Sequence, residues 1–396
     1  MTLFKMEWGS ITLPSGNFNW TQLNFQLEYE DPVIVCTPRY SAGETPRAVR
    51  VRNLTSTGCE LALQALKSGA TAPETIVSYL VMEAGVWDLS EAPFKCEAGK
   101  VTVSEADGSA NWWTNGVNVS WGQSYSGTPT IFAQVLTVNN TDYAVAYVHR
   151  YGTDQQNPPS FSDSGFYLGF HQGELTKTAP NHGEEVVGYI VIAAGTDGNN
   201  KIGTNQRIRT GDVVTGDPYQ VNISGFSQAP EVVIATQQEM DGSDGSFTIV
   251  NETASSYVKI EDEEDQFYDD ERNHTDETCA IWAFESAGSF QIGWLEGWNA
   301  RKWHKIQGSS GGQQTDYQIK LIIHYGTGTD YYDNDASPPV AHIYCGAKCK
   351  SDFGDIRFTD FDGVTELSYW IEEKICLLYT SPSPRDLSTS RMPSSA

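Results

Sequence analysis

The sequence predicts an all-β protein made of tandem antiparallel β-sandwich modules, the last of which is truncated. Three observations predict this fold: aromatic residues make up 12% of the 396 residues, glycine occurs 36 times, and β-branched or aromatic residues alternate with polar ones along the chain. Such a composition is typical of short strands joined by tight turns and does not favour helices. No apolar stretch reaches the roughly 18 residues of a membrane-spanning helix.

A four-part pattern occurs three times, at intervals of roughly 100 residues. Each copy has an alternating run, then a strand led by proline, then a middle element, and then a closing strand that ends in Ala-Gly. The proline-led strands are PVIVCTPRY from Pro32, PTIFAQVLT from Pro129 and PEVVIATQQ from Pro230. The closing strands are ETIVSYLVMEAG, EEVVGYIVIAAG and ETCAIWAFESAG, which end at Gly85, Gly195 and Gly288.

Each copy contains about six strand-like runs in roughly 100 residues, which indicates an antiparallel sandwich. We therefore expect sandwich modules at residues 1–97, 98–204 and 205–290, followed by a truncated sandwich domain at 291–375. A turn residue precedes the fifth strand of each copy, namely Gly58, Gly165 and Ser256.

The sparse cysteines predict buried thiols rather than a disulfide framework. Cys59 aligns with Phe166 and Tyr257, and Cys279 aligns with Ile76 and Val186. A bridge between Cys36 and Cys59 is the alternative.

Several residues of the repeat are shared with known families: Ala48-Val49-Arg50-Val51-Arg52-Asn53, Thr55, Thr57-Gly58 and Glu74-Thr75. On these residues the unit resembles the β-sandwich repeats of extracellular bacterial proteins, and it is distantly similar to H-type lectin modules. The lectin resemblance implies six-stranded sandwiches that bind galactosamine-type sugars as trimers or hexamers. A homo-oligomer is therefore an expectation, although the resemblance assigns no sugar contact to a numbered residue.

The last domain carries a different set of motifs: Thr315-Asp316-Tyr317-Gln318, Asp352-Phe353-Gly354-Asp355-Ile356-Arg357-Phe358-Thr359-Asp360, Asp362-Gly363 and Tyr369-Trp370-Ile371-Glu372. It resembles a domain of unknown function found on secreted and surface proteins of bacteria and archaea, which implies a β-sandwich that continues beyond these motifs. Residues 376–396, CLLYTSPSPRDLSTSRMPSSA, resemble a translated sequencing adapter. We expect this tail to take no part in the fold.

The net charge of −26 argues against nucleic acid and anionic membranes as partners, because both bind through clustered Lys and Arg. Motifs of serine hydrolases, zinc proteases and nucleotide-binding loops are missing from the sequence. We expect a non-catalytic adhesion protein, extracellular, at a cell surface or on a virion, whose partner is a glycan or surface receptor. The alternatives are a structural spacer of a surface layer or phage particle, and a glycan-cleaving enzyme with two facing carboxylates.

The best candidate for a sugar site is Asn111-Trp112-Trp113-Thr114-Asn115. Indole rings can stack on pyranose faces, and the amides of Asn111 and Asn115 can bond hydroxyl groups. The alternative is that these tryptophans pack at a sandwich edge.

Acidic loops are the candidates for calcium, which prefers several carboxylate and carbonyl oxygens on a flexible loop. We assign this role to Asp330, Asp333 and Asp335, and to Asp360 and Asp362, which could instead form an Asp-Gly hairpin turn. The run Glu261–Asp265, with Asp269-Asp270-Glu271, is interpreted as a solvated acidic loop, and calcium binding is the alternative. A zinc-like spacing at His342, Cys345 and Cys349 lacks a fourth ligand, which His304 or His324 could supply only through the fold.

Overall fold

The structure is a computed structural model of residues 1–396. It describes 4–89, 94–104, 116–152, 156–174, 182–193, 202–242, 245–292, 298, 300, 302, 319–336, 339–359, 363, 366–369 and 371–372. The chain divides into two compact units, residues 1–308 and 309–396. All the named regular elements in the described part are β-strands, which confirms the all-β prediction, and no helix in this part is long and apolar enough to cross a membrane.

The first module is a sandwich of two antiparallel three-stranded layers. One layer has the order β3-β6-β1 and the other β2-β5-β4. The strands are β1 (Phe4–Leu13), β2 (Thr21–Asn24), β3 (Pro32–Arg39), β4 (Arg47–Thr55), β5 (Gly58–Ala65) and β6 (Thr75–Glu83). Alternate side chains of both layers meet in a core that includes Ile34, Leu61 and Val81.

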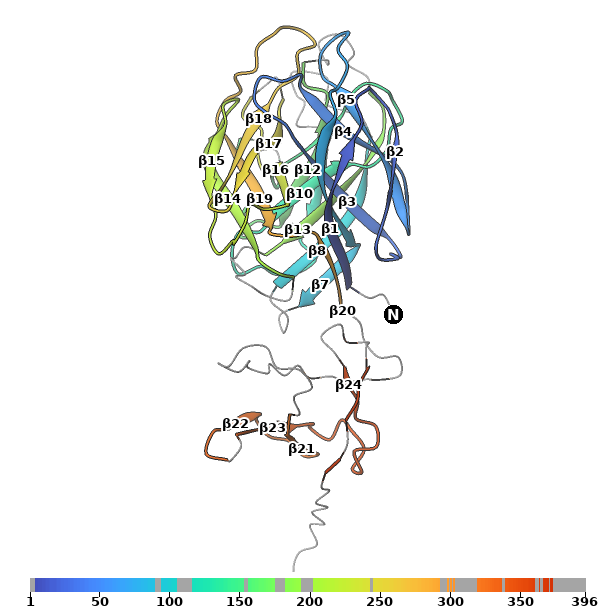
Figure 1. The fold of residues 1–396 in the computed structure, drawn as a ribbon, viewed down its shortest axis with the longest axis vertical. Helices are drawn as coiled ribbons and strands as arrows, with labels where there is room; N and C mark the ends of the chain where they lie inside the picture. The colour runs from blue at the N-terminus through green and yellow to red at the C-terminus, as the bar shows by residue number, and fades with distance from the viewer. Residues whose placement is uncertain are drawn as a thin grey trace, which may run out of the picture. The chain divides into compact units, whose positions relative to one another are not determined.

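The same strand order occurs twice more, and the strands of all three modules belong to unit 1 (Figure 1). In the second module the layers are β10-β13-β8 and β11-β12-β9, and in the third they are β14-β19-β16 and β15-β18-β17. The second module comprises β8 (Phe94–Val103), β9 (Val117–Ser120), β10 (Thr130–Val135), β11 (Val145–Arg150), β12 (Gly165–His171) and β13 (Glu185–Ile192). The third comprises β14 (Asn205–Val214), β15 (Tyr219–Asn222), β16 (Val232–Gln237), β17 (Phe247–Ala254), β18 (Tyr257–Glu263) and β19 (Glu277–Phe284).

Two further strands link the modules into a closed ring. β7 (Gly85–Leu89) follows the first module and pairs with β8 of the second. β20 (Gly288–Ile292) follows the third module and pairs with β1 of the first, so that Phe4 lies opposite Ile292. Each linking strand therefore widens the sheet of a module other than the one it follows. The boundaries expected after residues 97 and 290 fall inside β8 and β20.

Strand pairing defines which residues are equivalent in the three modules. Cys36, Ala133 and Ala235 occupy one position, because they face Tyr79, Tyr189 and Ile281 of the closing strands. The alignment of the third copy is one residue out at the cysteines: Cys59 corresponds to Phe166 and Val258, and Cys279 to Val77 and Val187. Cys59, Cys279 and their equivalents are buried, whereas Cys36 is half-buried. The described cysteines are free, so no Cys36–Cys59 bridge forms.

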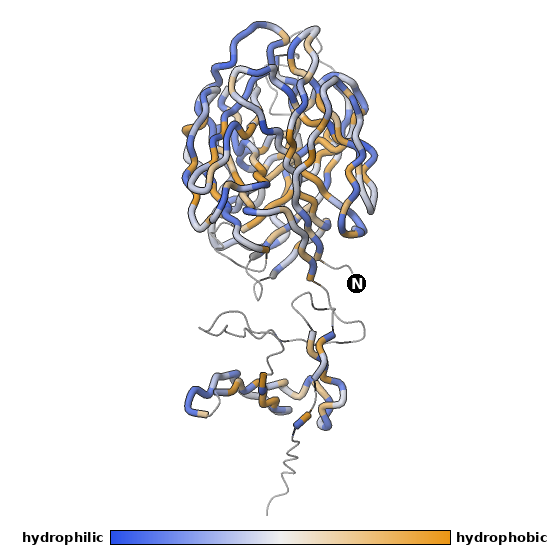
Figure 2. The backbone as a smooth tube through the Cα atoms, viewed as in Figure 1, coloured by the Kyte–Doolittle hydropathy of each residue, from blue (hydrophilic) through white to orange (hydrophobic). Residues whose placement is uncertain are grey.

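The central strands β3, β10 and β16 contact one another, so the three modules meet along a common axis. A mixed core cluster from all three modules, which includes Tyr40, Tyr143 and Phe247, packs around this axis. Figure 2 shows the apolar residues of unit 1 concentrated in the strands and the polar residues in the loops. This is the distribution expected when each sheet face is buried against another layer.

One polar side chain per module, buried in the first two modules and half-buried in the third, fixes the loop after the second strand. Glu7, Glu97 and Gln206 are equivalent residues on the first strands β1, β8 and β14. Each accepts a hydrogen bond from the backbone N–H two residues beyond the second strand: Gln26 at 2.9 Å, Gly122 at 2.8 Å and Ser224 at 2.9 Å. The three side chains thereby anchor the loop to the first strand of the same module.

The second unit is smaller. A three-stranded sheet has the order β21-β23-β22, made of β21 (Leu321–His324), β22 (Tyr331–Asp333) and β23 (Val340–Tyr344). β24 (Phe358–Thr359) and β25 (Glu366–Leu367) form a two-stranded sheet.

Candidate functional site

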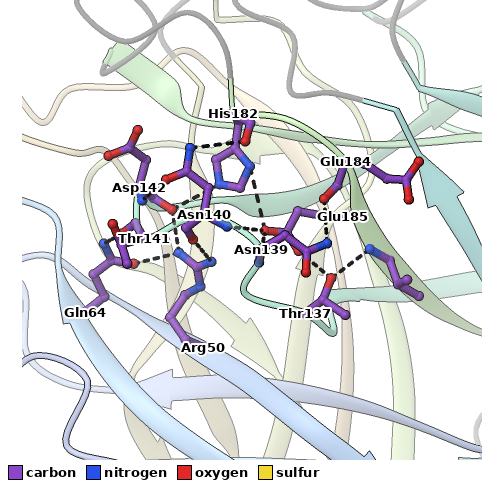
Figure 3. A network of polar contacts seen from close by, with 11 residues as sticks. Arg50, Gln64, Thr137, Asn139, Asn140, Thr141, Asp142, His182, Glu184 and Glu185 are labelled. Carbon is purple, nitrogen blue, oxygen red and sulfur yellow. Dashed lines mark hydrogen bonds and ion pairs between the residues drawn. The ribbon is translucent and has the colours of Figure 1, made fainter.

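The most polar interior region of unit 1 lies where a loop of one module covers a sheet of the next. We call the contact between β4 and β5 of the first module and residues 137–142 of the second the first junction (Figure 3). The second junction joins β11 and β12 to residues 240–242 and 245–246 of the third module. The third joins β17 and β18 to residues 40–44 of the first.

Arg50 organises the first junction. Its side chain is buried and donates to Gln64 Oε1 and to the Asp142 carbonyl, both at 2.7 Å. Gln64 in turn donates to the Thr141 carbonyl at 2.8 Å. Burial lowers the pKa of Arg50 to about 10, and the nearby carboxylates Glu185 and Asp142 oppose this shift. Arg50 therefore stays charged at neutral pH and holds a loop of the second module through its carbonyl groups.

Glu185 holds the other side of the same loop. It accepts hydrogen bonds from the Thr137 hydroxyl and from the backbone N–H of Asn139 at 2.9 Å. His182 lies 3.7 Å from Glu185 and bonds the Asp142 carbonyl at 3.0 Å. Burial lowers the pKa of His182, so a neutral ring that donates to this carbonyl fits the geometry.

The third module repeats this pair. His274 and Glu277 stand three residues apart like His182 and Glu185, and Glu277 accepts from the Asp241 N–H at 2.7 Å. The His274 ring also contacts Glu264 at 2.7 Å. Burial opposes charge on His274, but hydrogen bonds to Glu264 and Glu277 raise its pKa to about 10. These two His–Glu pairs could have been predicted from the sequence, because the pattern N-H-x-x-E occurs at residues 181–185 and again at 273–277.

At the second junction His171 has both ring nitrogens engaged. Its Nε2 lies 3.0 Å from the Ser246 carbonyl, and its Nδ1 accepts from the Gly173 N–H at 3.0 Å. This geometry fixes a neutral ring that donates from Nε2. Burial lowers the pKa of His171 to about 4. His171 occupies the position of Gln64 in the first module, so a neutral side chain of either type bonds a carbonyl of the neighbouring loop.

The interpretation of Glu261–Asp265 as a solvated loop was wrong. All five residues are buried, and the first three belong to β18. Asp265 accepts from the Tyr143 hydroxyl and from the Glu174 N–H of the second module, while Arg272 pairs with Glu263. The burial follows from ring closure, because the neighbouring modules cover this end of β18.

Burial raises the pKa of several carboxyl groups in this region. The pKa of Asp265 rises to about 7 and that of Asp262 to about 6, in each case because burial penalises the charged form more than the hydrogen bonds favour it. Asp262 accepts from Thr248 at 2.7 Å and lies 3.1 Å from the Cys279 sulfur. These groups are occupied with structural contacts and are closed to a large substrate.

A small cavity of about 50 Å³ lies on the axis where the modules meet. Its lining consists of equivalent residues from the three modules: Cys36, Ala133 and Ala235; Ala48, Val145 and Phe247; and Val49, Ala146 and Thr248, with Pro38, Gln134, Ala144, Thr236 and Gln237. Such a volume suits a few water molecules and excludes a sugar ring.

The predicted sugar residues Asn111, Trp112, Trp113 and Asn115 lie outside the described residues, as do Asp360 and Asp362. Of the other predicted calcium ligands, the carboxylates of Asp330 and Asp333 accept from backbone N–H groups, and Asp335 contributes one of these N–H groups. Asp333 accepts from Asp335 and Ala336, at 3.0 and 3.1 Å, and Asp330 accepts from Tyr344 at 2.8 Å. Within the described part of the chain, no three His, Cys, Asp or Glu residues are grouped to hold a metal.

His324, one of the two histidines considered as a fourth zinc ligand, lies beside His342. His324 Nε2 lies 2.9 Å from His342 Nδ1, because β21 and β23 pair in parallel with Ile322 beside His342. Two imidazoles alone make an incomplete zinc site.

The fold and these contacts define a class: an all-β protein of several sandwich layers closed into a ring through buried polar junctions. Comparisons with family models, curated proteins and solved structures found no match.

Proposed function

We propose that the chain is a non-catalytic adhesion protein that recognises glycans or a glycosylated surface receptor outside the cell or on a virion. The observation that carries this proposal is the ring of three sandwiches with one strand order. The ring gives one chain three equivalent sets of loops around an axis, as a trimer of single modules would have. Weak sites presented in this way gain through avidity.

The burial of the acidic residues favours binding over catalysis. A glycan-cleaving enzyme needs two carboxylates on either side of an open cleft. The largest acidic cluster of the described part, around Asp262 and Glu277, is instead buried and bonded to neighbouring loops. Its raised pKa values follow from burial in a junction, which explains them without a catalytic role.

A glycan array probed with the full chain tests the proposal. We expect binding to a subset of oligosaccharides, and loss of it in the variant Trp112→Ala/Trp113→Ala. The matched control is Phe161→Ala, which removes another aromatic side chain of the second module that is 49% exposed. A blank array at high protein concentration would refute glycan recognition and favour the structural spacer.

Calcium is the cofactor we propose for the second unit, held at the loop of Asp330, Asp333 and Asp335. An ion that binds only the folded form raises the melting temperature by mass action. The comparison is thermal unfolding in calcium and in chelator. Identical melting would show that these carboxylates serve only the backbone N–H groups that they bond.

A further inference from the structure

A half-exposed cluster on the outer face of the first module has features that its packing does not require. Trp20 immediately precedes β2, and the Arg52 guanidinium lies over its ring, 4.0 Å from the centroid. Arg52 also makes a two-pronged contact with Glu60 across the β4–β5 pair, at 3.0 and 3.3 Å. Trp20 and Arg52 are thereby held in fixed positions on a solvent-facing sheet surface.

Two residues beside this cluster adopt a left-handed backbone. Phe18 has φ of 56° and Asn53 has φ of 52°, and they are the only non-glycine residues with positive φ among the described residues of unit 1. Phe18 packs near Trp20, with ring centroids 6.1 Å apart. Asn53 lies at the irregularity in the pairing of β4 with β5, and its amide bonds Glu60. Left-handed backbone is unfavourable for a bulky side chain such as Phe and persists only where its surroundings enforce it.

The third module shows what this position looks like without the cluster. Glu252 and Lys259 take the places of Arg52 and Glu60, and they form an ion pair of opposite polarity at 2.7 Å. Pro218 stands where the first module has Trp20. A plain surface ion pair thus satisfies the sheet. The indole and the two left-handed residues are additions specific to the first module, and an exposed ion pair gains too little to explain them.

The cluster also retains hydrogen-bonding capacity. Among the residues that the structure describes, nothing bonds the Trp20 indole N–H or the Asn53 side-chain oxygen. A free donor, a free acceptor and an aromatic ring at one exposed place match a sugar, whose hydroxyl groups both donate and accept and whose ring has apolar faces. The Arg52–Glu60 pair is balanced in charge, which favours an uncharged ring over an acidic one.

We propose that Trp20, Arg52 and Asn53 form a binding subsite for an uncharged pyranose on the outer sheet of the first module. This inference rests on the proposed glycan recognition and adds a second location, in the first module, to the one proposed at Trp112 and Trp113 of the second. The subsite shares the outer face of the β4–β5 pair with Arg50 and Gln64 of the first junction, but the hydrogen bonds of Arg52 and Asn53 go to Glu60 and not to the loop 137–142. Ligand binding at the subsite therefore need not break the junction. The subsite belongs to one module only, which makes the ring chemically asymmetric toward its ligand.

The test uses the full chain and the variants Trp20→Ala and Arg52→Ala. The control is Lys259→Ala, which breaks the equivalent ion pair of the third module. Affinity is measured by calorimetry with the uncharged oligosaccharide that binds best on the array. We expect at least ten-fold weaker binding for Trp20→Ala and Arg52→Ala and no change for Lys259→Ala. Unchanged melting temperatures show that all three variants fold.

A second measurement follows the indole N–H resonances while methyl pyranosides are added, with Trp20→Phe identifying the resonance of Trp20. A shift of this resonance on addition of a pyranoside supports the subsite. If the array shows binding but Trp20→Ala binds normally, the subsite is refuted and glycan recognition stands. If the array is blank and no pyranoside moves the Trp20 resonance, both ideas fail.

Discussion

Replacing Glu97 by glutamine should change how stability depends on pH. Glu97 is 3% exposed, and burial raises its pKa from 4.5 to about 7. The equivalent residue of the third module is already a glutamine, Gln206, which makes the same contact to a loop N–H. The substitution therefore keeps the hydrogen bond and removes the ionisable group.

The sign and size follow from proton linkage. Between pH 4.5 and 7 the folded state keeps the Glu97 proton while the unfolded chain releases it, so folding loses about 1.4 kcal/mol for each pH unit as pH rises. The full penalty, about 3 kcal/mol, is reached above pH 7. Glutamine adds an amide N–H that lacks a partner at the place of Glu97 Oε1, which costs about 1 kcal/mol at every pH.

We therefore expect Glu97→Gln to be about 2 kcal/mol more stable than the parent at pH 8 and about 1 kcal/mol less stable at pH 4.5. Urea unfolding at a series of pH values measures this difference. The reverse change, Gln206→Glu, should add a pH dependence of the same sign as that of Glu97. If Glu97→Gln shifts stability equally at both pH values, the burial argument is wrong.

Three other predictions concern the junctions and the strands. Arg50→Ala should lower the free energy of unfolding, measured in urea, by about 3 kcal/mol because two buried charged hydrogen bonds are lost. Arg52→Ala, at an exposed ion pair, should lower it by less than about 1 kcal/mol. Equal losses would contradict the role of the first junction. Gly165→Ala should prevent stable folding because the new Cβ atom would lie 1.9 Å from the Val119 carbonyl oxygen. Gly211→Ala is the control: nothing lies near its new Cβ atom, so this variant should melt at the temperature of the parent. Because the pKa of His171 is lowered to about 4, the parent should lose about 1.4 kcal/mol of folding stability for each pH unit from pH 6.5 down to 4. His171→Gln, which introduces the residue of the equivalent position, should remove this pH dependence. A variant whose stability falls in acid as steeply as that of the parent would refute the assignment.

The strands were predictable because their signals are local. Alternating residues and turn glycines indicated sheets, and Gly58 and Gly165 stand at the start of a strand where a Cβ would meet the backbone of the neighbouring strand. The third copy was aligned one residue early at Cys59, where Pro230 was used as its anchor, and one residue late at Cys279, where the closing glycine Gly288 was used. Strand pairing places Glu231, not Pro230, at the position of Pro32 and Pro129.

The ring and its buried junctions were not predictable, because they depend on contacts between distant parts of the chain. Five acidic residues in a row indicate a solvated loop when read alone, yet Asp265 is buried because Tyr143 of another module covers it. The pairing of β1 with β20 has no signal in either strand. The junction residue Arg50 was quoted only as part of a family resemblance. The cluster around Trp20 also escaped notice, since left-handed backbone at Phe18 and Asn53 is visible only in the fold.

The pairing of β1 with β20 determines how the ring would respond to a pulling force. Phe4, at the start of β1, lies opposite Ile292, at the end of β20. Tension applied through the two ends of unit 1 therefore acts at the same end of the antiparallel ladder. Its hydrogen bonds would break one pair at a time, like a zipper, and not all together in shear. Peeling β20 away would leave β1 with a row of unpaired backbone groups, which is an edge that β20 of a second chain could occupy. If the chain acts in adhesion, as proposed above, the β1–β20 ladder would be the first part of the ring to open under load, and its opening would let stretched molecules pair with one another.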